Sequence, residues 1–129
     1  MIKQKFDVDG YWNVVVYYNV DYHFFDDIEF ELLMIDFPKD AIEETRRTMQ
    51  SGEAKAVTCS NFRKRVSVVL FNRHKNRYDY LNSIIHEAEH IKQHMLRAYN
   101  VDDEGEPPAY TIGYIAMRML MINPKLKLL

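Results

Sequence analysis

The chain has 129 residues and a nearly balanced charge, with 17 Lys and Arg against 19 Asp and Glu, giving a formal net charge of −2. That length suits one domain, so we expect residues 1–129 to form a single unit. The charge provides no general attraction to nucleic acid or anionic lipid, and we expect neither as a partner. No run approaches the ~18–20 apolar residues that cross a bilayer, and the N-terminus lacks the apolar segment of a secretory signal. Cys59 is the single cysteine. We therefore expect a cytoplasmic protein.

The first half of the chain predicts one strand followed by two helices. Residues 11–20 are dense in β-branched and aromatic types and predict a strand. Apolar residues recur at three- and four-residue steps over 21–36, as one face of a helix requires. Pro38 breaks that pattern and then suits the first turn of a second helix, residues 40–50, which Gly52 ends.

The second half predicts a hairpin followed by two more helices. Two short β-type runs, 54–59 and 65–71, are joined by the polar residues 60–64, whose basic cluster we interpret as a solvated turn. A continuous apolar stripe predicts a helix over 77–99, and a last helix is expected at about 109–122. The predicted order is β-α-α-β-β-α-α, an α+β domain with a small antiparallel sheet packed on helices.

The segment His86-Glu87-Ala88-Glu89-His90 matches H-E-x-x-H in the middle of the predicted helix 77–99. Residues four apart stack on one helical face, so two imidazoles can converge on one ion. Zn²⁺ binds neutral imidazole and keeps an open position for water in catalytic sites. Glu87 lies beside such a metal, where it can take a proton from bound water.

Position around the helix leaves two interpretations of the histidines open. At 100° per residue, His86 and His90 point away from the apolar stripe. They are then either exposed surface histidines or the floor of a cleft. His94, one turn beyond His90, cannot share the same ion in a straight helix and is interpreted as a surface or supporting residue. Gln93 and Leu96 stand where the longer metzincin motif requires a glycine and a third histidine.

Two segments resemble small zincin-like metallopeptidases carried by phages and other mobile elements of bacteria. One is His86 to Tyr114, with His-Glu-Ala-Glu-His and Gly-Glu-Pro-Pro-Ala-Tyr-Thr-Ile-Gly-Tyr; the other is Arg65-Val-Ser-Val-Val-Leu70. The resemblance covers roughly residues 55–120, and its most specific part is the H-E-x-x-H motif. It implies a minimal zincin-like fold and, as in gluzincins, a glutamate on a following helix that completes the zinc site.

By that likeness Glu106 is the expected third ligand, with Glu104 as the alternate. Tyr110 would then stand near the metal and hydrogen-bond a developing oxyanion, although packing alone is the more ordinary role for this tyrosine. Gluzincins commonly place an aspartate four residues after the ligand glutamate, and this chain has Tyr110 there. The residues that orient the histidines therefore stay open, and the candidates are Asn82, Asp79, Asp102 and Asp103.

The sequence supports two functions of different classes. The first is zinc-dependent hydrolysis of a peptide or protein substrate, with Glu87 as the general base. The substrate would bind as an extended strand beside residues 65–71 or 54–59. The second is a non-catalytic interaction or regulatory domain that zinc stabilises.

Overall fold

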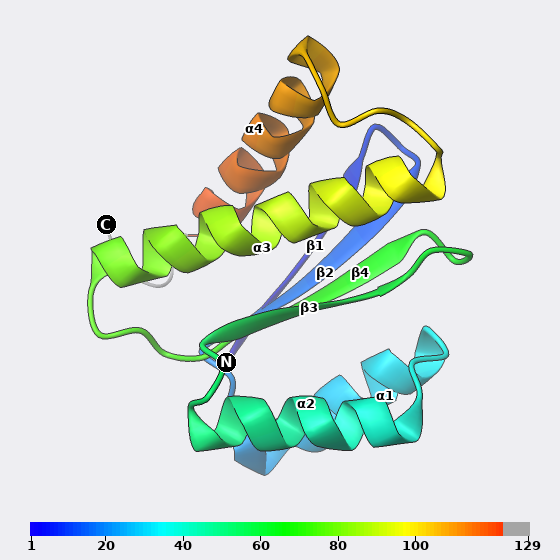
Figure 1. Cartoon of the computed structure of the whole chain (residues 1–129). Helices are drawn as coiled ribbons and strands as arrows, with labels where there is room; N and C mark the ends of the chain where they lie inside the picture. Colours follow the sequence, from blue (N-terminus) through cyan, green and yellow to red (C-terminus); the bar gives the residue numbers. More distant parts are fainter. Residues whose placement is uncertain (123–129) are drawn as a thin grey trace.

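The computed structural model of the protein describes residues 1–122 and has the expected α+β architecture (Figure 1). Its strands are β1 (Ile2–Val8), β2 (Trp12–Tyr18), β3 (Ala56–Asn61) and β4 (Val66–Phe71). Its helices are a 3-10 turn (Tyr22–Phe24), α1 (Phe25–Met34), α2 (Lys39–Ser51), α3 (Arg77–Ala98) and α4 (Glu106–Leu120). Within residues 1–122 no helix is both long and apolar enough to cross a membrane.

The four strands form one mixed sheet in the order β1-β2-β4-β3. The β1/β2 and β3/β4 pairs are antiparallel, but β2 and β4 run parallel. The expectation of an antiparallel sheet is corrected at this central pair. Parallel neighbours need a long crossover, and the segment from α1 to β3 supplies it.

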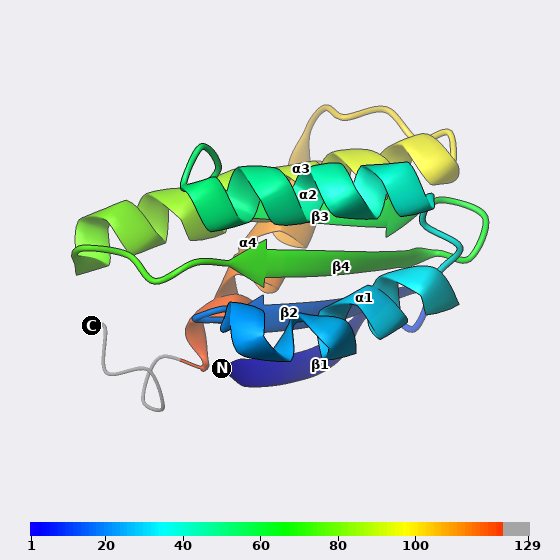
Figure 2. The same cartoon turned by 90° about the horizontal axis from the view of Figure 1, so that it is seen from below.

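Helices cover both faces of the sheet, with α3 and α4 on one side and α1 and α2 on the other (Figures 1 and 2). Alternate residues of β2 serve the two sides: Val14 and Val16 pack with α3 and α4, whereas Val15 and Tyr17 pack with α1 and α2. A strand that is buried on both faces has a continuous apolar sequence, and this is the pattern that predicted a strand at residues 11–20.

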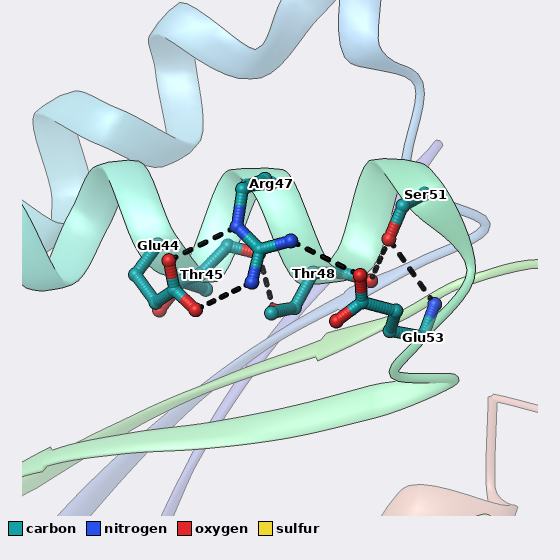
Figure 3. Close-up of polar contacts among 6 residues, drawn as sticks. All are labelled: Glu44, Thr45, Arg47, Thr48, Ser51 and Glu53. Carbon is teal, nitrogen blue, oxygen red and sulfur yellow. Dashed lines mark hydrogen bonds and ion pairs between the residues drawn. The ribbon is translucent and has the colours of Figure 1, made fainter.

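The C-terminal end of helix α2, before the chain continues into β3, is held by side-chain contacts (Figure 3). Arg47 bridges Glu44 at 2.7 Å and Glu53 at 3.0 Å. The Ser51 hydroxyl donates to the Thr48 carbonyl and accepts the Glu53 amide. Gly52 follows with φ of 82°, the left-handed conformation in which glycine commonly ends a helix.

Candidate metal centre

Helix α3 carries the H-E-x-x-H segment across the sheet, next to the outer strand β3. Asn76 starts the helix by accepting the Asp79 amide with its side chain. A buried stripe packs onto the sheet and α4; it consists of Tyr80, Ile84, Ala88, Ile91 and Met95. His86 lies on the opposite side, with 65% of its side chain exposed. The predicted orientation of the histidines, away from the core, is confirmed.

The two imidazoles face each other, with 3.1 Å between Nε2 of His86 and Nε2 of His90. Two nitrogens bound at 2.0–2.1 Å to a tetrahedral zinc ion are separated by about 3.3 Å. The observed spacing therefore suits a shared divalent cation to within a few tenths of an ångström. The same spacing is satisfied by one hydrogen bond when only one of the two nitrogens carries a proton.

Glu87 is buried between helix α3 and strand β3, with 4% of its surface exposed. The Thr58 hydroxyl donates to Oε1 at 2.9 Å, and Oε2 lies 3.9 Å from Nε2 of His86. Burial raises the pKa of Glu87, while the Thr58 hydrogen bond and the two nearby histidines act in the opposite direction. The result is an oriented carboxylate that holds a proton more readily than an exposed glutamate.

Beside the histidines, an open groove of about 390 Å³ runs between α3 and α4. His86 and His90 form part of its lining, together with Asn82, Ile85, Glu89, Gln93 and, from α4, Ile112. Of the four residues considered for orienting the histidines, Asn82 lies in this groove. Two of the others are engaged elsewhere, because Asp79 pairs with Lys55 and Asp103 pairs with Lys92.

His94 belongs to a different set of contacts on the same side of the helix. Its Nδ1 lies 2.8 Å from the Ser60 hydroxyl, which in turn is 2.7 Å from the Ser67 hydroxyl. The buried indole of Trp12 donates to Ser67 at 2.9 Å. This chain of hydrogen bonds holds α3 against β3. A role of His94 in supporting the metal ligands stays a prediction.

The third ligand expected from the resemblance is not brought to the histidines. Glu106 is the first residue of α4, and within residues 1–122 no ion pair joins Glu104 or Glu106 to either imidazole. Tyr110 is 74% exposed and lines a separate groove, next to Val8 and Asp9. Across that described part of the chain, no three His, Cys, Asp or Glu side chains converge as a metal ion would need. The roles of Glu106 and Tyr110 remain predictions.

Two residues at this site escaped the sequence analysis. Thr58 contacts Glu87 across 29 positions of the chain, and no local pattern marks it. Lys92 is almost fully buried and bridges Glu89 at 2.9 Å and Asp103 at 2.7 Å. A lysine within an amphipathic helix looks like an ordinary surface residue, yet this one attaches the loop before α4 to α3.

Comparisons of the chain with protein families, with curated proteins and with solved structures found no match.

Proposed function

We propose that the protein is a zinc-dependent peptidase in which His86 and His90 bind the metal and Glu87 is the general base. The observation that carries this proposal is the 3.1 Å spacing of the two Nε2 atoms, with a carboxylate oxygen of Glu87 3.9 Å from one of them. When bound, zinc would polarise the scissile carbonyl and lower the pKa of a water molecule.

Thr58 and Glu87 would supply the proton transfer in this reaction. Thr58 holds Oε1 of Glu87, which leaves Oε2 directed toward the imidazoles. In the proposed reaction Oε2 accepts a proton from the attacking water and later delivers it to the leaving amine. The raised pKa favours the first step, because the carboxylate accepts a proton more readily than an exposed one.

Strand β3 supports a peptide as the substrate. β4 is paired on both sides, so of the two strands considered from the sequence only β3 lies at an edge of the sheet. The Asn72 amide donates to the Lys55 carbonyl, so the alternate residues Ala56, Thr58 and Ser60 direct their amides and carbonyls away from β4. An extended peptide that pairs with this edge would pass Thr58, the residue that contacts Glu87.

A cytoplasmic setting with intracellular peptides as substrates is part of the same proposal. It is supported by Cys59, a free and buried thiol whose pKa burial raises to about 12. As the single cysteine of the chain, Cys59 can form no intramolecular disulfide, which fits a reducing compartment.

The zinc content of untagged protein tests the metal site. We expect about one zinc per chain in the wild type and loss of zinc in His86→Ala and His90→Ala. His94→Ala is the matched control on the same helix and should retain the metal. Zinc that is lost in only one of Glu106→Ala and Glu104→Ala would identify that glutamate as the third ligand, and zinc retained in both would exclude them. A wild-type protein that takes up no zinc from excess metal would refute the site.

The second candidate function is a non-catalytic domain that zinc stabilises. It is favoured by the open groove beside the histidines, since small-molecule and peptide substrates are usually bound in more enclosed clefts. Glu87→Gln discriminates between the two functions, because the amide keeps the Thr58 contact but cannot accept the proton. Peptide cleavage that disappears in this variant, with zinc retained, supports the peptidase. Zinc binding by a wild type that cleaves no member of a peptide library supports the binding domain.

A further inference from the structure

The second edge of the sheet, strand β1, has an unpaired side. The Asn13 amide donates to the Arg65 carbonyl, so odd-numbered residues of β2 face β4 and even-numbered residues face β1. The antiparallel register then turns Ile2, Gln4, Phe6 and Val8 toward β2. Lys3, Lys5 and Asp7 therefore direct their amides and carbonyls outward, and no other strand within residues 1–122 pairs with that side. The Asp7 carbonyl already accepts the Tyr114 hydroxyl at 3.3 Å and keeps a second lone pair for a partner N–H.

Helix α4 places exposed apolar side chains along this edge. It runs antiparallel to β1, since the Tyr114 hydroxyl donates to the Asp7 carbonyl and Nε2 of the Gln4 side chain donates to the Arg118 carbonyl. Met117 is 48% exposed and Met121, just after the helix, is 62% exposed; in the chain they flank Arg118, whose carbonyl the Gln4 side chain of β1 reaches. Near its end, a groove of about 430 Å³ is lined by Val8, Asp9, Pro107, Tyr110, Thr111 and Tyr114.

We propose that this surface binds a second copy of the chain, so that two β1 strands pair antiparallel about a two-fold axis at Phe6. In this register Lys5 of each copy lies opposite Asp7 of the other. The outward residues of the strand then meet in two opposite-charge pairs without a like-charge pair. A two-fold axis at Lys5 would place Lys5 of one copy opposite Lys5 of the other. An axis at Asp7 would place Lys5 opposite the turn after Val8.

The same axis matches the exposed methionines to the groove. It sets Gln4 of one copy opposite Val8 of the other. The C-terminal end of α4 in one copy therefore lies next to the groove at the N-terminal end of α4 in the other copy. Met117 and Met121 of each copy then cover the Tyr110 groove of its partner. The same two-fold arrangement therefore pairs the strands, matches their charges and covers the exposed methionines, as a symmetric interface requires.

Lysines on an outer strand commonly oppose edge-to-edge pairing, so charge alone would favour a monomer. Asp7 reverses that expectation for this register because it supplies the partner for Lys5. A different protein or peptide strand on the same edge would not need the Lys5–Asp7 match, and this difference is the basis of the test.

Sedimentation of the full chain between about 1 µM and 1 mM, a range that spans weak to moderate affinities, measures the association. We expect a monomer–dimer equilibrium in the wild type. Lys5→Glu alone and Asp7→Lys alone should each weaken it at least about tenfold, since two like-charge pairs replace two attractive ones. An equal mixture of the two variants should restore it as a heterodimer, in which both pairs are again opposite in charge. Circular dichroism of Asp7→Lys checks folding, because Asp7 also accepts the Gly10 amide.

Proline substitutions supply a second test that is independent of charge. Lys5→Pro removes an outward N–H without touching the bonds to β2, and it should abolish the dimer. Ala56→Pro does the same at the β3 edge and should leave the dimer unchanged. A wild type that stays monomeric at the highest concentration, or a dimer that survives Lys5→Pro, would overturn the proposal. Zinc content and peptide cleavage depend on α3 and β3, so their outcomes are separate from this one.

Discussion

The contact between Thr58 and Glu87 gives the sharpest test of how the fold prepares the candidate site. Thr58→Val keeps the size and β-branching of the side chain, so strand β3 is preserved while the hydroxyl donor is lost. Glu87 is 4% exposed, and its Oε1 receives a 2.9 Å hydrogen bond from that hydroxyl. Water cannot readily replace the donor at a site this buried.

The cost of this substitution depends on the charge of the carboxyl. A hydrogen bond to a charged group contributes about 1.5–3 kcal/mol to stability and one between neutral groups about 0.5–1.5 kcal/mol. Burial raises the folded-state pKa of Glu87 above its ordinary value. Below the ordinary pKa the carboxyl is protonated in both the folded and the unfolded state. As the pH rises through the folded-state pKa, the ionised form must be held in a buried position, and stability is lost. Thr58→Val should therefore cost more at neutral pH than near pH 4.

Urea denaturation of the metal-free protein at the two pH values measures this difference. We expect Thr58→Val to lower the free energy of unfolding by about 2 kcal/mol at neutral pH and by about 1 kcal/mol near pH 4. Thr58→Ser retains the donor and should cost less at both. In a Glu87→Gln background the cost should lose its pH dependence. An equal cost at both pH values, or one below about 0.5 kcal/mol, would refute the assigned contact.

Three further outcomes follow from other parts of the molecule. Ser67→Ala leaves the buried Trp12 indole without its acceptor, so it should lower the free energy of unfolding by about 1–3 kcal/mol and change the Trp12 fluorescence. Ser51→Ala, at an exposed position, should change the free energy of unfolding by no more than about 0.5 kcal/mol. Gly52→Ala meets open space but keeps a φ of 82°, so thermal unfolding should show a loss of about 1–2 kcal/mol that comes from the backbone alone. Ile91→Ala empties a fully buried position and should cost about 2–5 kcal/mol in urea denaturation.

The helices could be predicted closely because each carries its own periodic pattern and its own end signals. The predicted span 77–99 corresponds to Arg77–Ala98, and 40–50 corresponds to Lys39–Ser51. The last helix begins three residues earlier than predicted, at Glu106. Pro107 and Pro108 lie in its first turn, where proline is tolerated because its missing N–H has no helical partner.

Strand β1 was missed although its sequence, Ile-Lys-Gln-Lys-Phe-Asp-Val, alternates between two faces as a half-buried strand does; Gln4 interrupts the apolar series and weakens the pattern. Its buried side consists of Phe6 and Val8 with partly buried Ile2 and Gln4, and the other side is charged. An outer strand needs only one buried face, so its apolar content is low. The parallel pairing of β2 with β4 was equally inaccessible, because it depends on how the chain returns across α1 and α2 and not on any local pattern.

The candidate site was predictable in the part that one helix determines. At 100° per residue, Glu87 falls between the core stripe and the histidines whenever the histidines point outward. The exposed His86 and the buried Glu87 are thus two consequences of one spacing. The third ligand has no such constraint, since Glu106 lies on another helix whose placement depends on the loop that Lys92 anchors through Asp103.

This geometry also decides which observation is informative about catalysis. Any helix that bears H-E-x-x-H with exposed histidines will bury its glutamate at the border of the core, whether or not the protein is an enzyme. The burial of Glu87 and its raised pKa follow from that position alone. The Thr58 hydrogen bond does not, because helix spacing places no donor on a neighbouring strand. The aligned carboxylate beside an open sheet edge is therefore the feature that favours a peptidase over a zinc-stabilised domain, and Thr58→Val should reduce peptide turnover while zinc content stays unchanged. Turnover equal to that of the wild type would remove this argument for catalysis and leave the metal site standing.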